Sequence, residues 1–357
     1  MKVLRKRLLL KVIVITLLIN ILQGAARAEI KDNGNAPIRV GVFLYDLNDP
    51  FFSMIKESLM NIEKEKGNKV EFTFFDAKGN QYTQNESIDN ALSSHFDALI
   101  VNLVDQELNT IQGILNKVFE KNIPLIIYAD PNQELLNYVR TYKRAIFVAT
   151  DTKQAGLLQG KILINLWESN KESMDKNKDN ILQYIMFHGD PDSPEAIART
   201  KDVISTLNQA GIKTQQLSLT YCDWKEECAE NSMGLQFLNF GNKIEAIIAN
   251  NDAMAIGAIK TLQKYGYNKG DKAKTIPVVG IDGITEAKEF IKNGFMAGTV
   301  IQDPRDKAEV FYNASINMVS GESPLANTKF KFDETGIVVR LPYYEYPGVS
   351  DTINFAK

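Results

Sequence analysis

The sequence has few of the residues on which most enzymes depend. Its 357 residues include only two histidines, His95 and His188, and two cysteines. It has no G-x-S-x-G nucleophile elbow, no glycine-rich phosphate loop and no metal-hydrolase spacing. Paired carboxylates alone leave a glycosidase open. The amide side chains at its predicted strand ends nevertheless favour holding a ligand over cleaving it, so we expect a binding protein and not an enzyme.

The two cysteines, Cys222 and Cys228, lie close together in the segment YCDWKEEC. In an oxidising compartment such a pair can form a disulfide that joins a loop to the first turn of a helix. Two cysteines within one helix would be too far apart to bridge. Two reduced, partly buried cysteines are the alternative, so the sequence leaves the pairing open.

Residues 1–28 have the pattern of a secretory signal peptide. A basic start is followed by an apolar core over 12–22 and by Ala26-Arg27-Ala28 as a cleavage triplet. The alternative is an uncleaved membrane anchor, because the apolar stretch is only slightly short for a membrane span. No cysteine stands near the cleavage point, so we expect no lipoprotein anchor. We expect an exported protein in the periplasm or at the extracytoplasmic face of the membrane.

Charge narrows the choice of partners further. Removing residues 1–28 takes away six basic residues and no acidic ones, which changes the formal charge from −3 to −9. Such a balance disfavours nucleic acid and anionic membrane surfaces. We therefore expect a small-molecule ligand and no nucleic acid, and we expect the protein to be a monomer.

Strand-like apolar runs alternate with helix-like segments along most of the chain. The chain is too long for one compact core of the usual size, so two lobes are expected. Runs that are continuously apolar and β-branched are typical of parallel strands buried on both faces. The pattern predicts an α/β fold with two doubly wound parallel-sheet lobes. The predicted strands are 38–46, 69–77, 97–105, 123–130, 145–151, 181–190, 213–223, 245–252, 276–282 and 296–303.

Many of these strands end in Asp or Asn, as in VNLVD, VATD, FHGD, ANND and GID. Each such residue can simply cap the next helix. In open α/β sheets, however, ligands bind beyond the carboxyl ends of the strands, and both halves of the chain carry these endings. We therefore expect a cleft between the lobes. Carboxylates and amides suit sugar hydroxyls, and the aromatic residues Phe51, Phe52 and Trp224 follow strand ends and can cover the apolar face of a sugar.

A second site is indicated in the segment SMDKNKDNILQY, residues 173–184. Oxygen ligands at alternate positions, with a backbone carbonyl next, form the first part of a calcium loop. Asn180 replaces the usual glycine, which is tolerable because Asn adopts the left-handed conformation readily, and Met186 replaces the usual bidentate Glu. From spacing alone a solvated turn is favoured over a metal site. The candidate ligands are Asp175, Asn177, Asp179, the carbonyl of Ile181, and Gln183.

The chain resembles the periplasmic galactose/glucose-binding proteins of ABC sugar importers, which belong to the type I solute-binding superfamily. The resemblance runs from about Ile38 to Tyr346 and rests on the segments IEAIIANNDAMAIGA, VNLVD, PEAIART, GIKTQQLSL, VVGID and MAGTV. It implies the type I fold, in which a monosaccharide binds between two lobes that close on it. It also implies delivery to the membrane subunits of an ABC importer.

The resemblance also implies site residues. Phe51 and Trp224 would sandwich the sugar, and Asn251 would contact its hydroxyls while Asn250 and Asp252 cap and brace. Three positions depart from the family pattern: Ser193 and Glu195 replace His and Asp, and Gln302 replaces Asn. These departures leave the identity of the sugar open among glucose, galactose, another pyranose or a pentose. The implied polar contacts are Asp49, Asn102, Ser193, Glu195, Arg199, Asn251, Asp282 and Gln302.

For the metal site, the resemblance implies that the missing bidentate carboxylate comes from a distant strand, at the position of Glu245. With this residue the family's calcium ligands are all present in type. The resemblance therefore implies a structural calcium ion that fixes the loop to the second lobe, far from the sugar.

We also predict the domain boundaries. We expect a three-segment hinge with crossovers near 130–132, 302–304 and 322–330. The first lobe would comprise 38–130 plus 304–322, and the second 132–302 plus 330–357. An alternative function is a sugar sensor that docks on a chemoreceptor or a sensor kinase. A sugar-responsive repressor is disfavoured because an export signal stands where a DNA-binding helix-turn-helix would be needed.

Overall fold

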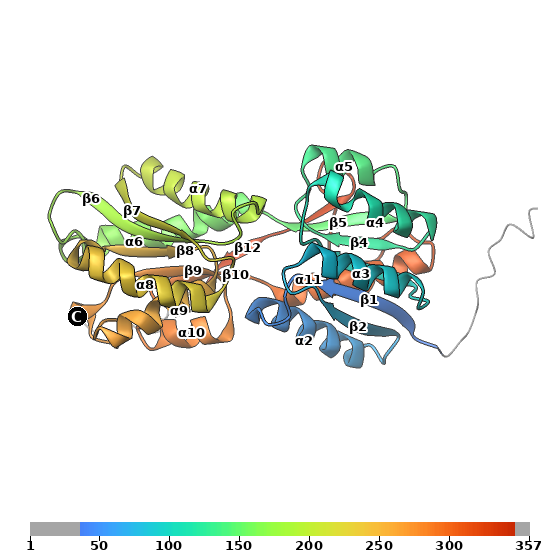
Figure 1. Cartoon of the computed structure of the whole chain (residues 1–357), viewed down its shortest axis with the longest axis horizontal. Coiled ribbons are helices and arrows are strands. Elements are labelled where there is room, and N and C mark those ends of the chain that lie inside the picture. Colours follow the sequence, from blue (N-terminus) through green and yellow to red (C-terminus); the bar gives the residue numbers. More distant parts are fainter. Residues whose placement is uncertain (1–35, 347–357) are drawn as a thin grey trace, which may run out of the picture. The chain divides into compact units, whose positions relative to one another are not determined.

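The computed structural model describes residues 36–346 and contains two six-stranded sheets within that range (Figure 1). The predicted signal peptide lies outside the described residues. Each of the ten predicted strands is present, which confirms the α/β fold with two parallel-sheet lobes. Strands β11 and β12, which the sequence pattern did not predict, complete the two sheets.

The first lobe is built on the sheet of order β11-β5-β4-β3-β1-β2, whose strand pairs are all parallel. Its strands are β1 (Ile38–Leu44), β2 (Val70–Asp76), β3 (Ala98–Asn102), β4 (Leu125–Tyr128), β5 (Ala145–Thr150) and β11 (Val338–Leu341). Its helices are α2 (Pro50–Glu65), α3 (Gln81–Leu92), α4 (Leu108–Glu120), α5 (Gln133–Val139) and α11 (Pro304–Val319).

The second lobe is built on the sheet of order β12-β10-β9-β8-β6-β7, in which only the β10–β12 pair is antiparallel. Its strands are β6 (Ile181–His188), β7 (Lys213–Tyr221), β8 (Ala246–Ala249), β9 (Val278–Asp282), β10 (Gly298–Gln302) and β12 (Tyr343–Glu345). Its helices are α6 (Thr152–Met174), α7 (Pro194–Gln209), α8 (Glu226–Phe240), α9 (Asp252–Lys264) and α10 (Thr285–Lys292).

Each sheet is buried on both faces, as the continuous apolar runs require. In β3, Ala98 and Ile100 belong to the core cluster that contains α2 and α11, whereas Leu99 and Val101 belong to the cluster that contains α4 and α5. Successive side chains of a strand point to opposite faces, so one short apolar strand contributes to two cores. The carboxyl ends of the strands are left free to present the polar residues that follow them.

Two of the three predicted crossovers are wrong. Strand β5 pairs in parallel with β4, so the chain leaves the first sheet after β5 and not near 130–132. Strand β11 pairs with β5, so the last crossover falls at Pro342 and not near 322–330. The second crossover, between β10 and α11, falls at Asp303 as predicted. The prediction failed because lobe membership depends on which strand a segment pairs with, and local pattern does not encode the partner.

The first lobe therefore comprises residues 38–150 and 304–341, and the second comprises residues 152–302 and 343–346. Within residues 36–346, no helix combines the length and hydropathy of a membrane span.

Candidate functional site

Strand ends and helix starts of both lobes surround one cavity of about 610 Å³. Parallel strands place their carboxyl ends at one edge of a sheet, and the next helix begins there, so short polar side chains from distant parts of the chain meet at this edge. All ten residues predicted to contact a sugar line this cavity. The structure thus brings the predicted residues together, and their contact with a ligand remains a prediction.

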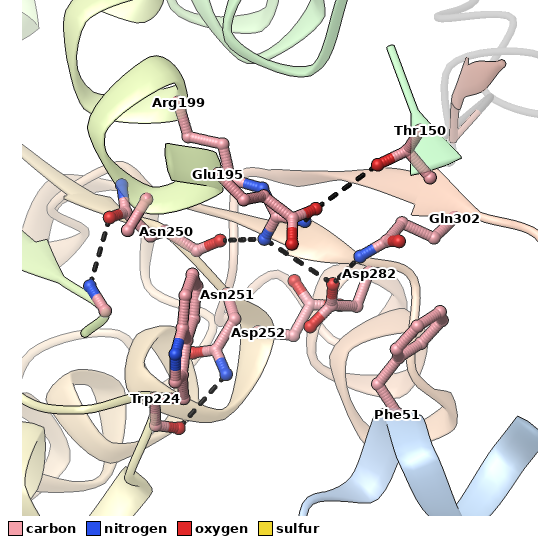
Figure 2. Close-up of polar contacts among 12 residues, drawn as sticks. Phe51, Thr150, Glu195, Arg199, Trp224, Asn250, Asn251, Asp252, Asp282 and Gln302 are labelled. Atoms are coloured by element: carbon pink, nitrogen blue, oxygen red, sulfur yellow. Dashed lines mark hydrogen bonds and ion pairs between the residues drawn. The ribbon is translucent and has the colours of Figure 1, made fainter. Parts of the chain in front are cut away.

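Arg199 of α7 is the centre of the polar group in this cavity (Figure 2). Its side chain is only 2% exposed, and its guanidinium donates to the carbonyl of Asn250 at 2.6 Å and to Glu195 Oε1 at 2.5 Å. Burial acts to lower the pKa of Arg199, but the charge of Glu195 raises it above its ordinary value. Its Nε has no hydrogen-bond partner. A buried donor left unpaired is costly, so this N–H is a position for a ligand oxygen.

Glu195 is held by three donors, which are Arg199, Tyr343 of β12 and Thr150 of β5. Burial raises the pKa of the Glu195 carboxyl, but the positive charge of Arg199 and the hydroxyl of Tyr343 together hold it below its ordinary value. Glu195 is therefore an ionised acceptor. The contact with Thr150 joins the second lobe to strand β5 of the first lobe.

Asp282 and Gln302 form the second polar pair. Gln302 Nε2 donates to Asp282 Oδ1 at 2.6 Å, and Arg199 Nη1 lies 3.8 Å from the same oxygen. Burial raises the pKa of Asp282 well above its ordinary value, against the opposing charge of Arg199. The backbone of Asp282 has φ of +128°, a conformation that side chains rarely adopt. Strain of this kind persists where the surroundings over-determine a residue, and it is concentrated at functional sites.

An aromatic residue from each lobe lines the cavity. In the view of Figure 2, Phe51 of α2 and Trp224 of the β7–α8 loop lie on opposite sides of the polar group around Asp282. Phe51 is only 4% exposed. The ring of Trp224 packs on Gly189 so closely that a Cβ there would lie 2.5 Å from it, and the Arg199 guanidinium lies 5.6 Å from the ring centroid. Both rings are thus fixed in position before any ligand enters.

The three polar residues after β8 have separate contacts. Asn251 is the N-cap of α9, since its Oδ1 accepts from Met254 N, and its Nδ2 donates to the carbonyl of Trp224. Asn250 bonds Gly189 and Thr200, and Asp252 accepts from the backbone of Gly283. The structure therefore corrects one expectation, because Asn251 performs the capping that was assigned to Asn250 and Asp252. Both of these neighbours brace, as predicted.

Three other predicted residues also act as local structural groups. Asp49 caps α2 by accepting from Phe51 N at 2.7 Å, and Ser193 caps α7 by accepting from Ala196 N. Asn102 accepts from Tyr45 N and donates to the carbonyl of Tyr128. Capping and ligand contact are compatible, because each oxygen can accept more than one hydrogen bond.

Sequence reasoning missed two residues of this polar group. Tyr343 is 1% exposed, and its hydroxyl contacts both Glu195 and Arg199. Lys307 of α11 is also 1% exposed, and its Nζ donates to Gln302 Oε1 at 2.9 Å. Tyr343 lies on the short strand β12, which is recognised as a strand by its pairing with β10 and not by its sequence pattern. A lysine in a helix normally indicates a solvated face, so no local signal marked Lys307 as buried.

The predicted calcium loop joins α6 to β6. Within residues 36–346, no group of three or more His, Cys, Asp or Glu side chains is arranged to hold a metal ion. The loop's carboxylates instead accept backbone N–H groups: Asp175 from Asp179 and Asn180, and Glu245 from Lys176 and Gln183. Asn180 has φ of +62°, the left-handed conformation expected for it.

The donor set of this loop nevertheless fits a hard cation. Gln183 Oε1 is buried without a hydrogen-bond partner, while Gln183 Nε2 donates to Asp179 Oδ2. Glu245 is 1% exposed, and burial together with the charges of Asp175 and Asp179 raises its pKa. An unpaired amide oxygen beside carboxylates that only N–H donors contact is the environment that an oxygen-seeking dication would satisfy.

Two lobes that meet at a cleft lined by capping carboxylates and amides are typical of a ligand-binding protein. A family model for the periplasmic binding protein domain matches residues 40–323, and the chain belongs to the periplasmic binding protein family. This membership confirms the predicted class, a binding protein and not an enzyme. Proteins of this family work outside the cytoplasm, in agreement with the predicted export.

One curated relative supports the same assignment, and solved structures share the fold. The D-galactose/methyl-galactoside binding periplasmic protein MglB of Haemophilus influenzae is 33% identical over 307 residues, covering 85% of this chain and 88% of that protein. A solute binding protein from Bacillus halodurans with bound myo-inositol has a TM-score of 0.68 at 25% identity, covering 88% and 96% of the two chains. One from Actinobacillus succinogenes with bound D-allose has a TM-score of 0.71 at 18% identity, covering 87% and 97%.

Proposed function

We propose that this protein binds a monosaccharide outside the cytoplasm and delivers it to an ABC importer. The observation that carries the proposal is the cavity in which the Arg199–Glu195–Asp282–Gln302 group lies between an aromatic residue of each lobe. Planar carboxylate, amide and guanidinium groups suit adjacent hydroxyls on a ring. Aromatic rings suit the apolar faces of a sugar.

A galactose- or glucose-like pyranose is the ligand we test first. The relative with 33% identity is named for D-galactose, whereas the structural neighbours were solved with myo-inositol and D-allose. All three ligands are ring polyols. Ser193, Glu195 and Gln302 differ in side-chain length from the residues of the family pattern at these positions. A buried polar group without a hydrogen-bond partner costs roughly 1–3 kcal/mol. These three positions would therefore decide which of such rings binds.

Lobe closure is the proposed mechanism. A sugar that touches both lobes can favour the closed form only by binding it better than the open form. Membrane subunits of an importer would then recognise the closed form. The alternative predicted from the sequence, docking on a chemoreceptor or a sensor kinase, uses the same closure and differs in the membrane partner. Sugar-dependent capture of membrane proteins would separate the two.

Calorimetry against a panel of hexoses and pentoses tests the ligand. We expect binding by wild type, and a loss of about 10- to 100-fold in affinity for Asp282→Ala and for Trp224→Ala, because each removes a buried cavity contact. Trp167→Phe is the matched control, since Trp167 lies in the second-lobe core and is the other tryptophan. Unchanged affinity in Trp224→Ala, or no binding of any panel sugar by wild type, would contradict the proposal.

We further propose that the α6–β6 loop binds a structural calcium ion. Asp175, Asn177, Asp179, Gln183, the carbonyl of Ile181 and Glu245 would hold it, and the unpaired oxygen of Gln183 supports the assignment. The ion would supply positive charge to a loop whose carboxylates are compensated only by N–H donors. These residues belong to the second lobe and are absent from the lining of the sugar cavity.

Thermal unfolding with and without a chelator tests this calcium proposal. A ligand that binds only the folded state stabilises it, so added calcium should raise Tm and EDTA should lower it. Glu245→Gln should abolish this response, whereas Glu172→Gln, an exposed acid just before the loop, should retain it. Sugar affinity should change less than about twofold, because the loop lies outside the sugar cavity. A calcium response that persists in Glu245→Gln would overturn the assignment.

A further inference from the structure

Lys307 is a buried cation next to the ligand cavity. It lies in the first turn of α11, immediately after the crossover at Asp303, and its side chain is 1% exposed. Within residues 36–346 it forms no ion pair with a carboxylate. Its Nζ lies 5.1 Å from the ring centroid of Phe51 and 5.6 Å from that of Tyr128. A buried, unpaired ammonium is costly, so its retention calls for a role.

The hydrogen-bond partner of Lys307 points to that role. An ammonium group only donates, whereas a Gln amide donates from nitrogen and accepts at oxygen. Lys307 Nζ donates to Gln302 Oε1 at 2.9 Å, so the oxygen of this amide must face the lysine. Gln302 Nε2 consequently faces Asp282, to which it donates at 2.6 Å. The cavity is lined by Gln302 and Asp282, and Lys307 is absent from its lining.

On the basis of the proposed monosaccharide function, we propose that Lys307 is a positioning residue that fixes the amide orientation of Gln302 and so determines which hydrogen-bonding groups the cavity offers. With the oxygen of Gln302 held by Lys307, the cavity receives an N–H from Gln302 and a carboxylate oxygen from Asp282. A hydroxyl group accepts from the first and donates to the second. An amide turned the other way would set two acceptors side by side, which would disfavour the same hydroxyl.

This arrangement is linked to pH through the lysine. Burial lowers the pKa of Lys307 to about 8, against the charges of Glu195, Asp282 and Asp303, which raise it, while Arg199 lowers it. Tyr128, which faces it from β4, stays neutral because burial raises its pKa well above 10. The ammonium form, present below about pH 8, fixes the amide. Above that pH the amine can also accept a hydrogen bond, so affinity should fall as pH rises through about 8.

A double-mutant cycle tests the role of Lys307. Affinity for D-galactose, or for the panel sugar that wild type binds best, is measured in wild type, Lys307→Met, Gln302→Leu and the double variant. We expect Lys307→Met to weaken binding about tenfold in the wild-type background and less than about twofold when Gln302 is already Leu. Equal losses in the two backgrounds, or no loss in either, would overturn the proposal.

The pH arm uses the same proteins. Wild-type affinity should decline between pH 7 and 9, and Lys307→Met should show a flat profile over that range, as should Gln302→Leu. Lys161→Met, which removes an exposed lysine of α6, should keep the wild-type profile. Circular dichroism establishes that each variant folds, and Lys307→Gln replaces the Met variant if it does not. A flat wild-type profile would count against the proposal whatever the variants do.

The controls also separate this proposal from the function on which it rests. If wild type binds no sugar of the panel, the proposed function fails before the cycle begins. If wild type binds a sugar and the two losses are equal, only the role of Lys307 is removed.

Discussion

Asp49 shows how one residue can serve local structure and the site at once. It caps α2 through Phe51 N and Phe52 N, and it also lines the cavity. Burial raises its pKa to about 6, although the two backbone N–H groups act to lower it. The start of α2 provides N–H donors to this carboxyl, but its position in the cavity wall excludes water from it. Its charge is therefore costly in the absence of a ligand.

The sign of this shift predicts a pH dependence of stability. The pKa of Asp49 is higher in the folded state than the ordinary 3.8, so between about pH 4 and pH 6 the folded state binds more protons than the unfolded state. Its contribution to stability therefore improves as pH falls through about 6. Asp49→Asn keeps the cap without the charge, so its Tm should exceed that of wild type at pH 7, with the gap closing near pH 4.

The control for this prediction is Asp271→Asn, which changes an exposed acid that likewise caps a helix start. Its Tm should follow that of wild type in shape over the same pH range. A constant gap between Asp49→Asn and wild type from pH 4 to pH 7 would contradict a raised pKa at Asp49.

At the scale of one element, the β7–α8 loop presents Trp224 under unusual backbone constraint. Asp223 and Trp224 have φ of +49° and +66°, a conformation that disfavours both side chains. Cys222 and Cys228 are joined by a disulfide that fastens the end of β7 to the first turn of α8. The sequence left this pairing open. The disulfide is the covalent closure of the loop that holds one aromatic wall of the cavity.

Removing this disulfide should therefore affect both stability and binding. Cys222→Ala/Cys228→Ala should lower the free energy of unfolding by about 2 kcal/mol, since a short loop in the unfolded chain is released. It should also weaken sugar affinity several-fold, because Trp224 is then no longer preorganised. Denaturant unfolding and calorimetry measure the two effects. Treating wild type with reductant should reproduce both changes, and the Ala variant should be indifferent to reductant.

A loss of stability without any loss of affinity would show that the rest of the loop holds Trp224 unaided. The hydrogen bond from Asn251 to the carbonyl of Trp224, and the packing on Gly189, are the contacts that would then be responsible.

At the scale of the whole molecule, contacts across the cavity decide how readily the lobes separate. The hydroxyl of Tyr45, which follows β1, donates to Asp223 Oδ1 at 2.9 Å, and so links a first-lobe loop to a second-lobe loop. Burial and the charge of Asp223 raise the pKa of Tyr45, so the hydroxyl keeps its proton at neutral pH. The carboxylate of Asp223 also forms an ion pair with Lys225, whose Nζ lies 2.6 Å from Asp223 Oδ2.

Tyr45→Phe should therefore weaken sugar affinity about threefold, mainly through faster dissociation, because the closed form loses a hydrogen bond that is partly screened by solvent. Stopped-flow tryptophan fluorescence measures the rate, in a Trp167→Phe background so that the signal comes from Trp224. Tyr82→Phe is the control, since Tyr82 is exposed and bonds Glu86 within α3. A dissociation rate equal to that of wild type would mean that the Tyr45–Asp223 contact does not contribute to closure.

The sequence by itself determined the ten main strands, the two-lobed α/β class and the ring of polar strand ends. Each of these features depends on residues that are close together in the sequence. Apolar β-branched runs form buried strands, and Asp or Asn at the strand ends caps the next helix. The family resemblance added the assignment of individual residues such as Arg199 and Trp224, which the structure places at one cavity.

Only the tertiary structure decided which lobe contains β5 and β11, that Cys222 and Cys228 are paired, and that Lys307 and Tyr343 are buried beside the site. These features depend on partners far away in the chain. A strand can pair with any compatible edge, and a helical lysine is solvated unless another element covers it. Strand pairing and side-chain burial are decided by packing between residues that are far apart in the sequence. A short stretch of sequence therefore does not reveal them.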